Sequence, residues 1–259
     1  MSKDNKALST QLNEETELAL RESYPIEAGT NRIILPRLGM VSQDKVEGKG
    51  KAMKVITEAG TFYVEKQTDE ENEEGKKVWS HAEIGDSIEG IILFQRKQLR
   101  MYDEKTELFT SSPIYDNDEE VLPLFCNKAE VGRGTPAELK AEYQYTDQDG
   151  KSKSRLEDNR VLYVEHKGEI YQMTLRGSSM YSFMTYARKV VPPTVITVFS
   201  SEFKEKGTIA WNQMTFSAKR KLTQTEAEAT MDKIGEIRNA VKLERAQFNK
   251  DTVSKIENF

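Results

Sequence analysis

The chain has 259 residues, of which 37% are hydrophobic and 31% are charged, with a mean hydropathy of −0.69 and a formal net charge of −5. A polar composition whose apolar residues still cluster predicts a packed core with long solvated loops, in one large or two small domains. The single cysteine, Cys126, excludes an intramolecular disulfide and a multi-cysteine metal site. No segment resembles a signal peptide or an apolar run of membrane length, so we expect a soluble, cytoplasmic protein without membrane contact.

The first part of the chain predicts a flexible arm followed by a small β extension. Residues 1–30 are polar and rich in glutamate, which is typical of a flexible N-terminal arm. The next segment, 32–38, is apolar and broken by a proline, so it suits the edge of a sheet. Residues 52–57 and 61–65 flank a glycine-containing turn and form a hairpin candidate. The acidic stretch 69–76 is expected to be a solvated loop.

Residues 87–102 form a long strand candidate and carry the strongest signal for a ligand. Alternation places aromatic and basic side chains on one face of this strand. These side chains are Phe94, Arg96, Gln98, Arg100 and Tyr102. Such a face suits single-stranded nucleic acid, because bases stack on rings at about 1–3 kcal/mol each while arginines contact phosphates. The alternative is that Phe94 belongs to the core and the arginines line an ordinary solvated face.

A long excursion, residues 103–159, is expected to be a loop, and loops of this length are normally functional or disordered. Within it, residues 108–109 and 121–126 could add short strands or pack as a flap. The segment 160–221 then predicts strand, turn, strand, helix, strand, loop and strand. Its strands are rich in β-branched and aromatic residues, and two prolines end the helix. The strands are expected at 161–165, 169–175, 194–199 and 208–216, and the helix at 180–187.

Together with strand 87–102, these elements give the order β-β-β-α-β-β, which is that of an oligonucleotide/oligosaccharide-binding (OB) barrel. We therefore predict a mainly β chain with helices: a five-stranded OB-type Greek-key barrel with long inter-strand insertions, an N-terminal β extension and a C-terminal helix. Thr223 and Glu226 form a capping box at the start of that helix. The predicted boundaries are 31–221 for the OB-type domain, 69–76 and 103–159 for its loops, 222–249 for the helix and 250–259 for the tail.

Basic residues concentrate in the predicted barrel. Between residues 160 and 221, ten lysines and arginines stand against four glutamates, which leaves +6 in a chain whose total is −5. Acidic residues gather instead at 69–74 and 116–120. A basic sheet in an acidic chain suits a polyanionic ligand. The alternative is that the lysines only solvate the strand surfaces.

Side chains suited to catalysis are scarce. The chain has two histidines, His81 and His166, and one cysteine, so neither a Cys–His nor a Ser–His–Asp constellation is expected, and no spacing supports zinc. The acidic run 116–120 could hold Mg²⁺ in a nuclease site, but a contiguous acidic run is more typical of a solvated loop. We expect a protein that is not an enzyme and has no cofactor or metal.

The whole pattern resembles phage-encoded single-stranded DNA-binding proteins with an OB fold. The resemblance rests on strand 88–102, the hairpin around Gly168, the helix start at 177–183 and the strand that contains Trp211. It implies a non-catalytic protein of replication or recombination in a phage-infected bacterium, which binds single-stranded DNA with low sequence specificity. RNA, replication proteins and a second copy of the chain are further partners. In this family an acidic tail with a terminal aromatic residue recruits partners; here lysines offset the acids before Phe259.

We expect DNA contacts from the first strand, the hairpin strands, the last inter-strand loop and the last strand. For Tyr163 and Trp211, burial in the core is the alternative, and Lys204 and Lys206 could be plain loop charges. The alternative function is a virion or scaffold-type β protein that self-assembles, and a metal-dependent nuclease is a third. The predicted nucleic-acid-binding residues are Phe94, Arg96, Arg100, Tyr102, Tyr163, Arg176, Phe203, Lys204, Lys206 and Trp211.

Overall fold

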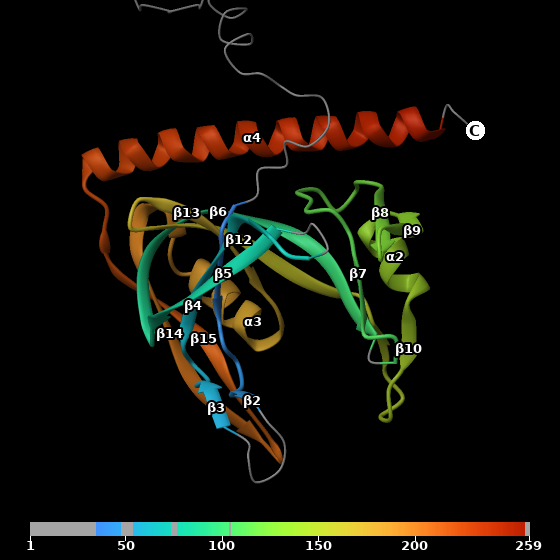
Figure 1. Ribbon diagram of the computed structural model, residues 1–259, viewed down its shortest axis with the longest axis horizontal. Coiled ribbons are helices and arrows are strands. Elements are labelled where there is room, and N and C mark those ends of the chain that lie inside the picture. Colours follow the sequence, from blue (N-terminus) through green and yellow to red (C-terminus); the bar gives the residue numbers. More distant parts are fainter. Residues whose placement is uncertain (1–34, 48–53, 74–76, 104, 257–259) are drawn as a thin grey trace, which may run out of the picture. The chain divides into compact units, whose positions relative to one another are not determined.

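The structure is a computed structural model that describes residues 35–47, 54–73, 77–103 and 105–256, with side chains as far as residue 241 (Figure 1). The predicted arm and the last three residues of the predicted tail lie outside the described residues. Contacts separate a unit that spans Ile34–Arg238 from the helical stretch that begins at Asn239. The sheets, the cores and the candidate site all belong to the first unit.

The chain is mainly β, and its described strands form one large open sheet and two small hairpins. Along the large sheet, neighbouring strands follow the order β5-β4-β1-β13-β12-β6-β7-β8-β9, and β14 pairs with both β6 and β15. The strands of the large sheet are β1 (Arg37–Met40), β4 (Phe62–Glu71), β5 (Lys77–Gly85), β6 (Ser87–Asp103), β7 (Leu108–Ser111), β8 (Leu122–Cys126), β9 (Ala129–Gly134), β12 (Glu157–His166), β13 (Glu169–Leu175), β14 (Val195–Lys206) and β15 (Ile209–Lys221). The hairpins pair β2 (Lys45–Glu47) with β3 (Lys54–Thr57) and β10 (Gln144–Thr146) with β11 (Ser152–Ser154).

Five of these strands coincide with the strands that the sequence predicted for the barrel. They are neighbours in the order β13-β12-β6-β14-β15, and each pair is antiparallel. The closed barrel is not confirmed, because among the described residues β13 and β15 do not pair. Backbone N–H groups of β15 bond elsewhere: Asn212 N donates to Ser42 O at 2.7 Å, and Met214 N donates to Ser179 Oγ at 3.0 Å. The large sheet is therefore open.

Strand β6 connects the two halves of the sheet. Its first residues pair with β14, its middle with β12 and its last residues with β7. Gly90 lies where β6 passes from β14 to β12, and a Cβ there would come within 2.6 Å of the Glu165 carbonyl oxygen. The register with β12 then shifts between Ile92 and Phe94, so Leu93 is the extra residue of a β-bulge. The close backbone approach at Gly90 thus allows β6 to pair with β14 and then with β12.

The larger core lies between the central strands and helix α3 (Gly177–Ala187). Successive side chains of a strand point to opposite faces, so alternate residues of β12 and β13 point inward. Among them are Leu162, Val164, Met173 and Leu175, and α3 contributes Phe183. Each such side chain contributes about 1.5–3 kcal/mol when it is fully buried. The short 3-10 helix Pro192–Thr194 follows α3, where the sequence predicted that prolines end the helix.

The excursion 103–159 is folded for most of its length, which corrects the prediction of a loop. It contains β7 to β11, helix α2 (Pro136–Glu142) and the start of β12, at the opposite end of β6 from β14 (Figure 1). A Thr135–Glu138 capping box begins α2. Strands β7 and β8 coincide with the two short-strand candidates at 108–109 and 121–126, whereas β9, β10 and β11, of three to six residues, gave too short a pattern to be seen in the sequence. The second core of this region consists of Leu99, Tyr115, Leu122, Leu124, Leu139 and Leu156.

The other predicted loop and the C-terminal helix also need adjustment. Strand β4 extends as far as Glu71, so the predicted loop 69–76 begins too early. Helix α4 (Gln224–Ile256) starts with the predicted capping box, in which Thr223 N donates to a Glu226 carboxylate oxygen at 2.8 Å. The helix continues past residue 249 into the predicted tail. Among the described residues, no helix is both long and apolar enough to cross a membrane.

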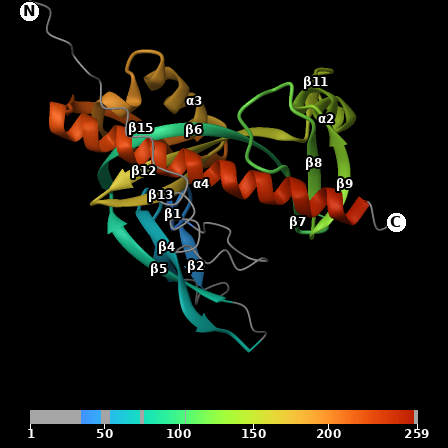
Figure 2. The ribbon, with the colours of Figure 1, turned by 90° about the horizontal axis from the view of Figure 1, so that it is seen from above.

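The first half of α4 crosses β6 and β12 (Figure 2). Lys233 forms an ion pair with Glu165 of β12 at 2.7 Å. The Arg238 guanidinium lies 5.7 Å from the centre of the Phe94 ring on β6. Ile237 is buried on the same side of the helix. These contacts place the start of α4 on the outer face of the sheet, opposite the larger core.

Candidate nucleic-acid interface

Strand register determines which side chains share the outer face of the sheet, because residues directly opposite each other on neighbouring strands point the same way. One row crosses six strands, from β6 through β12, β13, β1 and β4 to β5. The core residues of β12 and β13 lie between these positions and point to the other face. The row consists of Phe94, Tyr163, Gln172, Arg37, Glu65 and His81.

Three arginines come together on this outer face from distant parts of the sequence. Arg37 begins β1, Arg100 lies near the end of β6, and Arg176 immediately precedes α3. The pKa of the Arg100 guanidinium is lowered, first by burial and then by the positive charges of Arg176 and Arg37. Three positive charges gathered on one face would be stabilised by an anion between them.

Aromatic rings accompany the arginines. The Arg100 guanidinium lies 3.9 Å from the centre of the Phe109 ring, and the Arg37 guanidinium lies 4.4 Å from the centre of the Trp79 ring. Tyr102 and Phe109 form a tilted pair with ring centres 4.7 Å apart, and they are 48% and 44% exposed. We call the group of Arg37, Tyr63, Trp79, Arg100, Tyr102, Phe109 and Arg176 the arginine face.

Tyr63 joins the two sides of the arginine face. Its ring lies over Gly39, where a Cβ would come within 2.5 Å of the ring, so the close contact requires glycine. Burial, followed by the charge of Glu65, raises the pKa of the Tyr63 phenol, while Arg37 and Arg176 act in the opposite direction. The phenol therefore lies within the field of both arginines.

The acidic side chains of this face leave two of the arginines unpaired. Glu65 lies 3.8 Å from Arg37 and 3.6 Å from His81. Glu157 is opposite Arg100 in the register of β6 and β12, yet no ion pair joins them. Over the part of the chain that the structure describes, no carboxylate pairs with Arg100 or Arg176. Both guanidinium groups can therefore contact an external anion without breaking an ion pair.

Three of the predicted site residues instead stabilise the fold. Phe94 and Tyr163 stack with ring centres 4.3 Å apart and an interplanar angle of 12°, and Tyr163 is only 3% exposed. Arg96 is 6% exposed, and it donates to Asp116 Oδ1 at 2.9 Å and to Ile114 O at 3.0 Å. The strand alternation was correct, but other parts of the chain cover these side chains. Arg238 of α4 lies over Phe94, which stacks on Tyr163, and the segment around Asp116 binds Arg96. These three predicted residues are not part of the arginine face.

The remaining predicted residues lie in three places. Arg100, Tyr102 and Arg176 belong to the arginine face. Trp211 donates from Nε1 to Ser178 Oγ at 3.0 Å, beside the gap between β13 and β15. The other three lie near the turn of the β14–β15 hairpin: Phe203, which is 62% exposed, Lys204, which pairs with Glu202 at 2.6 Å, and Lys206, which is exposed.

The arginine face contains four residues that the sequence analysis did not propose: Arg37, Tyr63, Trp79 and Phe109. Alternation along β4 could have placed Tyr63 and Glu65 on one face, and Phe109 forms a short apolar pair with Leu108. The sequence contains no signal that β1 lies between β4 and β13, and this insertion is what brings Arg37 and Trp79 to the same face.

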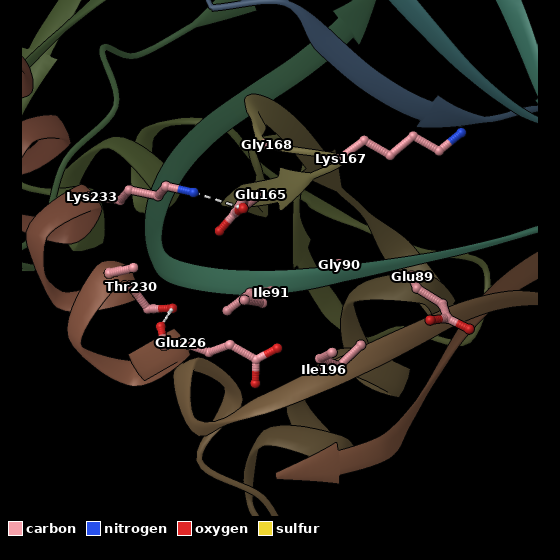
Figure 3. A pocket seen from close by; sticks show the side chains of 11 residues that line it. Glu89, Gly90, Ile91, Glu165, Lys167, Gly168, Ile196, Glu226, Thr230 and Lys233 are labelled. Atoms are coloured by element: carbon pink, nitrogen blue, oxygen red, sulfur yellow. Dashed lines mark hydrogen bonds and ion pairs between the residues drawn. The ribbon is translucent and has the colours of Figure 1, made fainter. Parts of the chain in front are cut away.

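A pocket of about 290 Å³ lies between the start of α4 and the β12–β13 hairpin (Figure 3). Its carboxylates are largely paired: Glu165 with Lys233, and Glu226 with Arg220 at 2.7 Å. The Arg220 guanidinium, followed by hydrogen bonds from Thr223, lowers the pKa of Glu226 to about 2. Within the described ranges, no group of three or more His, Cys, Asp or Glu side chains could hold a metal ion. The paired carboxylates at this pocket thus help to anchor the start of α4.

The acidic run 116–120 is used mainly for ion pairs with β6. Asp116 pairs with Arg96, and Asp118 pairs with Lys97. The Lys97 ammonium group is the main reason why the pKa of Asp118 is lowered.

Comparison of the chain with models of known protein families, with curated proteins and with solved structures found no match.

Proposed function

We propose that the chain is a non-catalytic protein that binds single-stranded DNA with low sequence preference, in replication or recombination. The observation that carries the proposal is the arginine face. It combines three guanidinium groups with four rings on one outer face, and two of the three guanidinium groups have no carboxylate partner among the described residues. Phosphates would neutralise the arginines, while bases stack on the rings.

We further propose that the five central strands form an OB-type barrel whose last gap is bridged by residues 36–43. The order β13-β12-β6-β14-β15 is that of an OB barrel without its closing pair. On one side of the gap, Gln172 N of β13 donates to Pro36 O at 2.9 Å; on the other, Asn212 N of β15 donates to Ser42 O at 2.7 Å. In an OB barrel, oligonucleotides bind across the second and third strands. Here those strands are β12 and β13, whose outer face leads directly to Arg176.

The charges and rings favour a single strand over a duplex. In a duplex the bases are stacked on one another, so the rings of Tyr102 and Phe109 could reach only groove edges or backbone. A single strand offers its base faces as well as its phosphates. The pKa of Arg100 is lowered by burial and then by the charges of Arg176 and Arg37, and an anion nearby would offset both effects. Binding should therefore depend on both salt and unpaired bases.

The test measures fluorescence anisotropy of labelled oligo-dT and of duplex DNA at about 50 and about 200 mM salt, the range over which phosphate contacts lose affinity. We expect tighter binding to the single strand, and weaker binding at the higher salt. Replacement of Arg100 and Arg176 by alanine should lower the slope of log affinity against log salt by about 1.4, since each contact to a single strand contributes about 0.7. Arg188 and Lys189, which are exposed at the end of α3, provide a double-alanine control with the same loss of charge.

The other function classes give different outcomes. No binding by the wild-type chain would refute the proposal. In that case, concentration-dependent assembly in sedimentation would support the scaffold-type alternative. Loss of oligonucleotide that depends on Mg²⁺ would support the nuclease alternative. Binding of wild type that the Arg100/Arg176 double variant leaves unchanged would show that DNA binds to another surface.

A further inference from the structure

The arginine face has a second cation–π pair that lies far from Arg100 along the order of the strands. Trp79 is on β5, the edge strand of the large sheet, and Arg37 lies above its ring from β1. The Arg37 side chain is 61% exposed, so the guanidinium is accessible to a ligand although one side of it covers the indole. Neither residue belongs to the five central strands.

The two cation–π pairs mark opposite ends of one surface. From Phe109 on β7 to Trp79 on β5, the sheet order is β7-β6-β12-β13-β1-β4-β5. Arg176, Tyr63 and the face of β13 lie between the two ends. After burial, the charges of Arg176 and Arg37 lower the pKa of Arg100, which agrees with the sheet order in placing both ends on one surface.

Resting on the proposed function, we propose that the N-terminal β extension supplies a second stacking subsite, in which the Arg37–Trp79 pair holds a base or its phosphate from the same DNA strand that contacts Arg100 and Phe109. Strand neighbours lie about 4.8 Å apart, so six steps from β7 to β5 correspond to a path of about 29 Å along the sheet. A stacked single strand rises about 3.4 Å per nucleotide, so this path holds about eight nucleotides, and fewer when the strand is extended. That number falls within the range of about 4–16 nucleotides for one OB fold.

Neighbouring side chains fit the same ligand. Tyr63 and His81 form a tilted ring pair with centres 4.7 Å apart beside the Arg37–Trp79 pair. The Lys45 ammonium group lies 5.0 Å from the centre of the Tyr63 ring. This end of the surface therefore repeats the combination of rings and cations found at Arg100 and Phe109. A lone cation–π pair would serve the fold alone, whereas repeated combinations on one face suit a polyanion with aromatic bases.

The chain has only two tryptophans, Trp79 and Trp211, which allows each end to be observed separately. In a Trp211→Phe variant, all tryptophan emission comes from Trp79. We expect oligo-dT of about 12 nucleotides to quench this emission, and oligo-dT of about 4 nucleotides to quench it much less. In a Trp79→Phe variant, the emission of Trp211 should change little, because its indole N–H is bound to Ser178.

Affinity gives a second, independent measurement. Trp79→Ala should weaken binding of the longer oligo-dT at least about fivefold, which corresponds to the loss of one stacked base, and should weaken binding of the shorter one less than twofold. Val78→Ala is the matched control, since Val78 is the preceding residue on the same edge strand and points to the opposite face. Thermal unfolding of both variants shows whether the strand remains folded.

The outcomes distinguish this inference from the proposed function. If the wild-type chain binds the longer oligo-dT and Arg100→Ala weakens it, the proposed function stands. Unchanged affinity in Trp79→Ala together with unquenched Trp79 emission would then overturn the second subsite alone. If the wild-type chain binds no oligo-dT, both are overturned. If Trp79→Ala unfolds the chain, Trp79 emission in the Trp211→Phe variant decides the question.

Discussion

Arg96 and Arg100 lie on the same face of the same strand, yet the structure gives them opposite roles. Arg96 is 6% exposed and donates hydrogen bonds to Asp116 and to the Ile114 carbonyl oxygen. Arg100 is partly exposed and stacks on Phe109 without a carboxylate partner among the described residues. Replacing each by alanine should therefore affect two different quantities: the free energy of unfolding for Arg96, and the affinity for single-stranded DNA for Arg100.

The magnitudes follow from these contacts. Arg96→Ala removes two hydrogen bonds from a charged donor and leaves the Ile114 carbonyl without this partner, which should cost about 2–3 kcal/mol of the free energy of unfolding. Asp116 is 60% exposed on its side chain, so water can replace the guanidinium there and the cost stays below that of a fully buried pair. Arg100→Ala removes the cation–π contact with Phe109 and, under the proposed function, one phosphate contact. The expected loss of affinity is about 1–2 kcal/mol, or about 5- to 30-fold.

Urea denaturation and fluorescence anisotropy with oligo-dT separate the two effects. Arg96→Ala should lower the denaturation midpoint and, at temperatures where it is folded, bind DNA like wild type. Arg100→Ala should keep the free energy of unfolding within about 0.5 kcal/mol of wild type, bind oligo-dT more weakly and lower the salt slope by about 0.7. The reasoning is refuted if Arg96→Ala loses affinity while its stability is unchanged, or if Arg100→Ala unfolds the chain.

Two further predictions concern the anchoring of α4. Lys233→Ala removes the partly buried ion pair with Glu165 and should lower stability by about 1 kcal/mol in urea denaturation; no change would show that the ion pair does not hold the helix. The pKa of Glu226 is lowered from 4.5 to about 2 by Arg220, so its contribution to stability is present above pH 4.5 and is lost as pH falls towards 2. Helicity followed by circular dichroism through this window should fall less steeply in Glu226→Gln than in wild type, and identical curves would contradict the assignment.

The sequence was sufficient to predict elements whose pattern lies within one continuous segment. Strands such as β6 and β12 alternate over many residues, and the Thr223–Glu226 capping box marked the start of α4 correctly. It was insufficient wherever pairing over a long distance decides the environment of a side chain. Arg96 has the same strand parity as Arg100, and only the return of the segment around Asp116 to β6 buries one and not the other. Alternation gives the face of a residue, but it does not give what covers that face.

The width of the arginine face and the failure of the barrel to close have the same structural cause. In a closed barrel, β13 would pair with β15, so the free backbone edge of β13 could not pair with β1. Here the Ser42 carbonyl and the Ser179 side chain accept hydrogen bonds from β15 instead, and β13 pairs with β1. Pairing with β1 adds β4 and β5 to the sheet, and these strands bring Trp79 to the face that contains Arg100. If the proposed function holds, the open seam extends the surface available to DNA beyond the five central strands, because each strand added beside β13 carries its outward side chains to the same side.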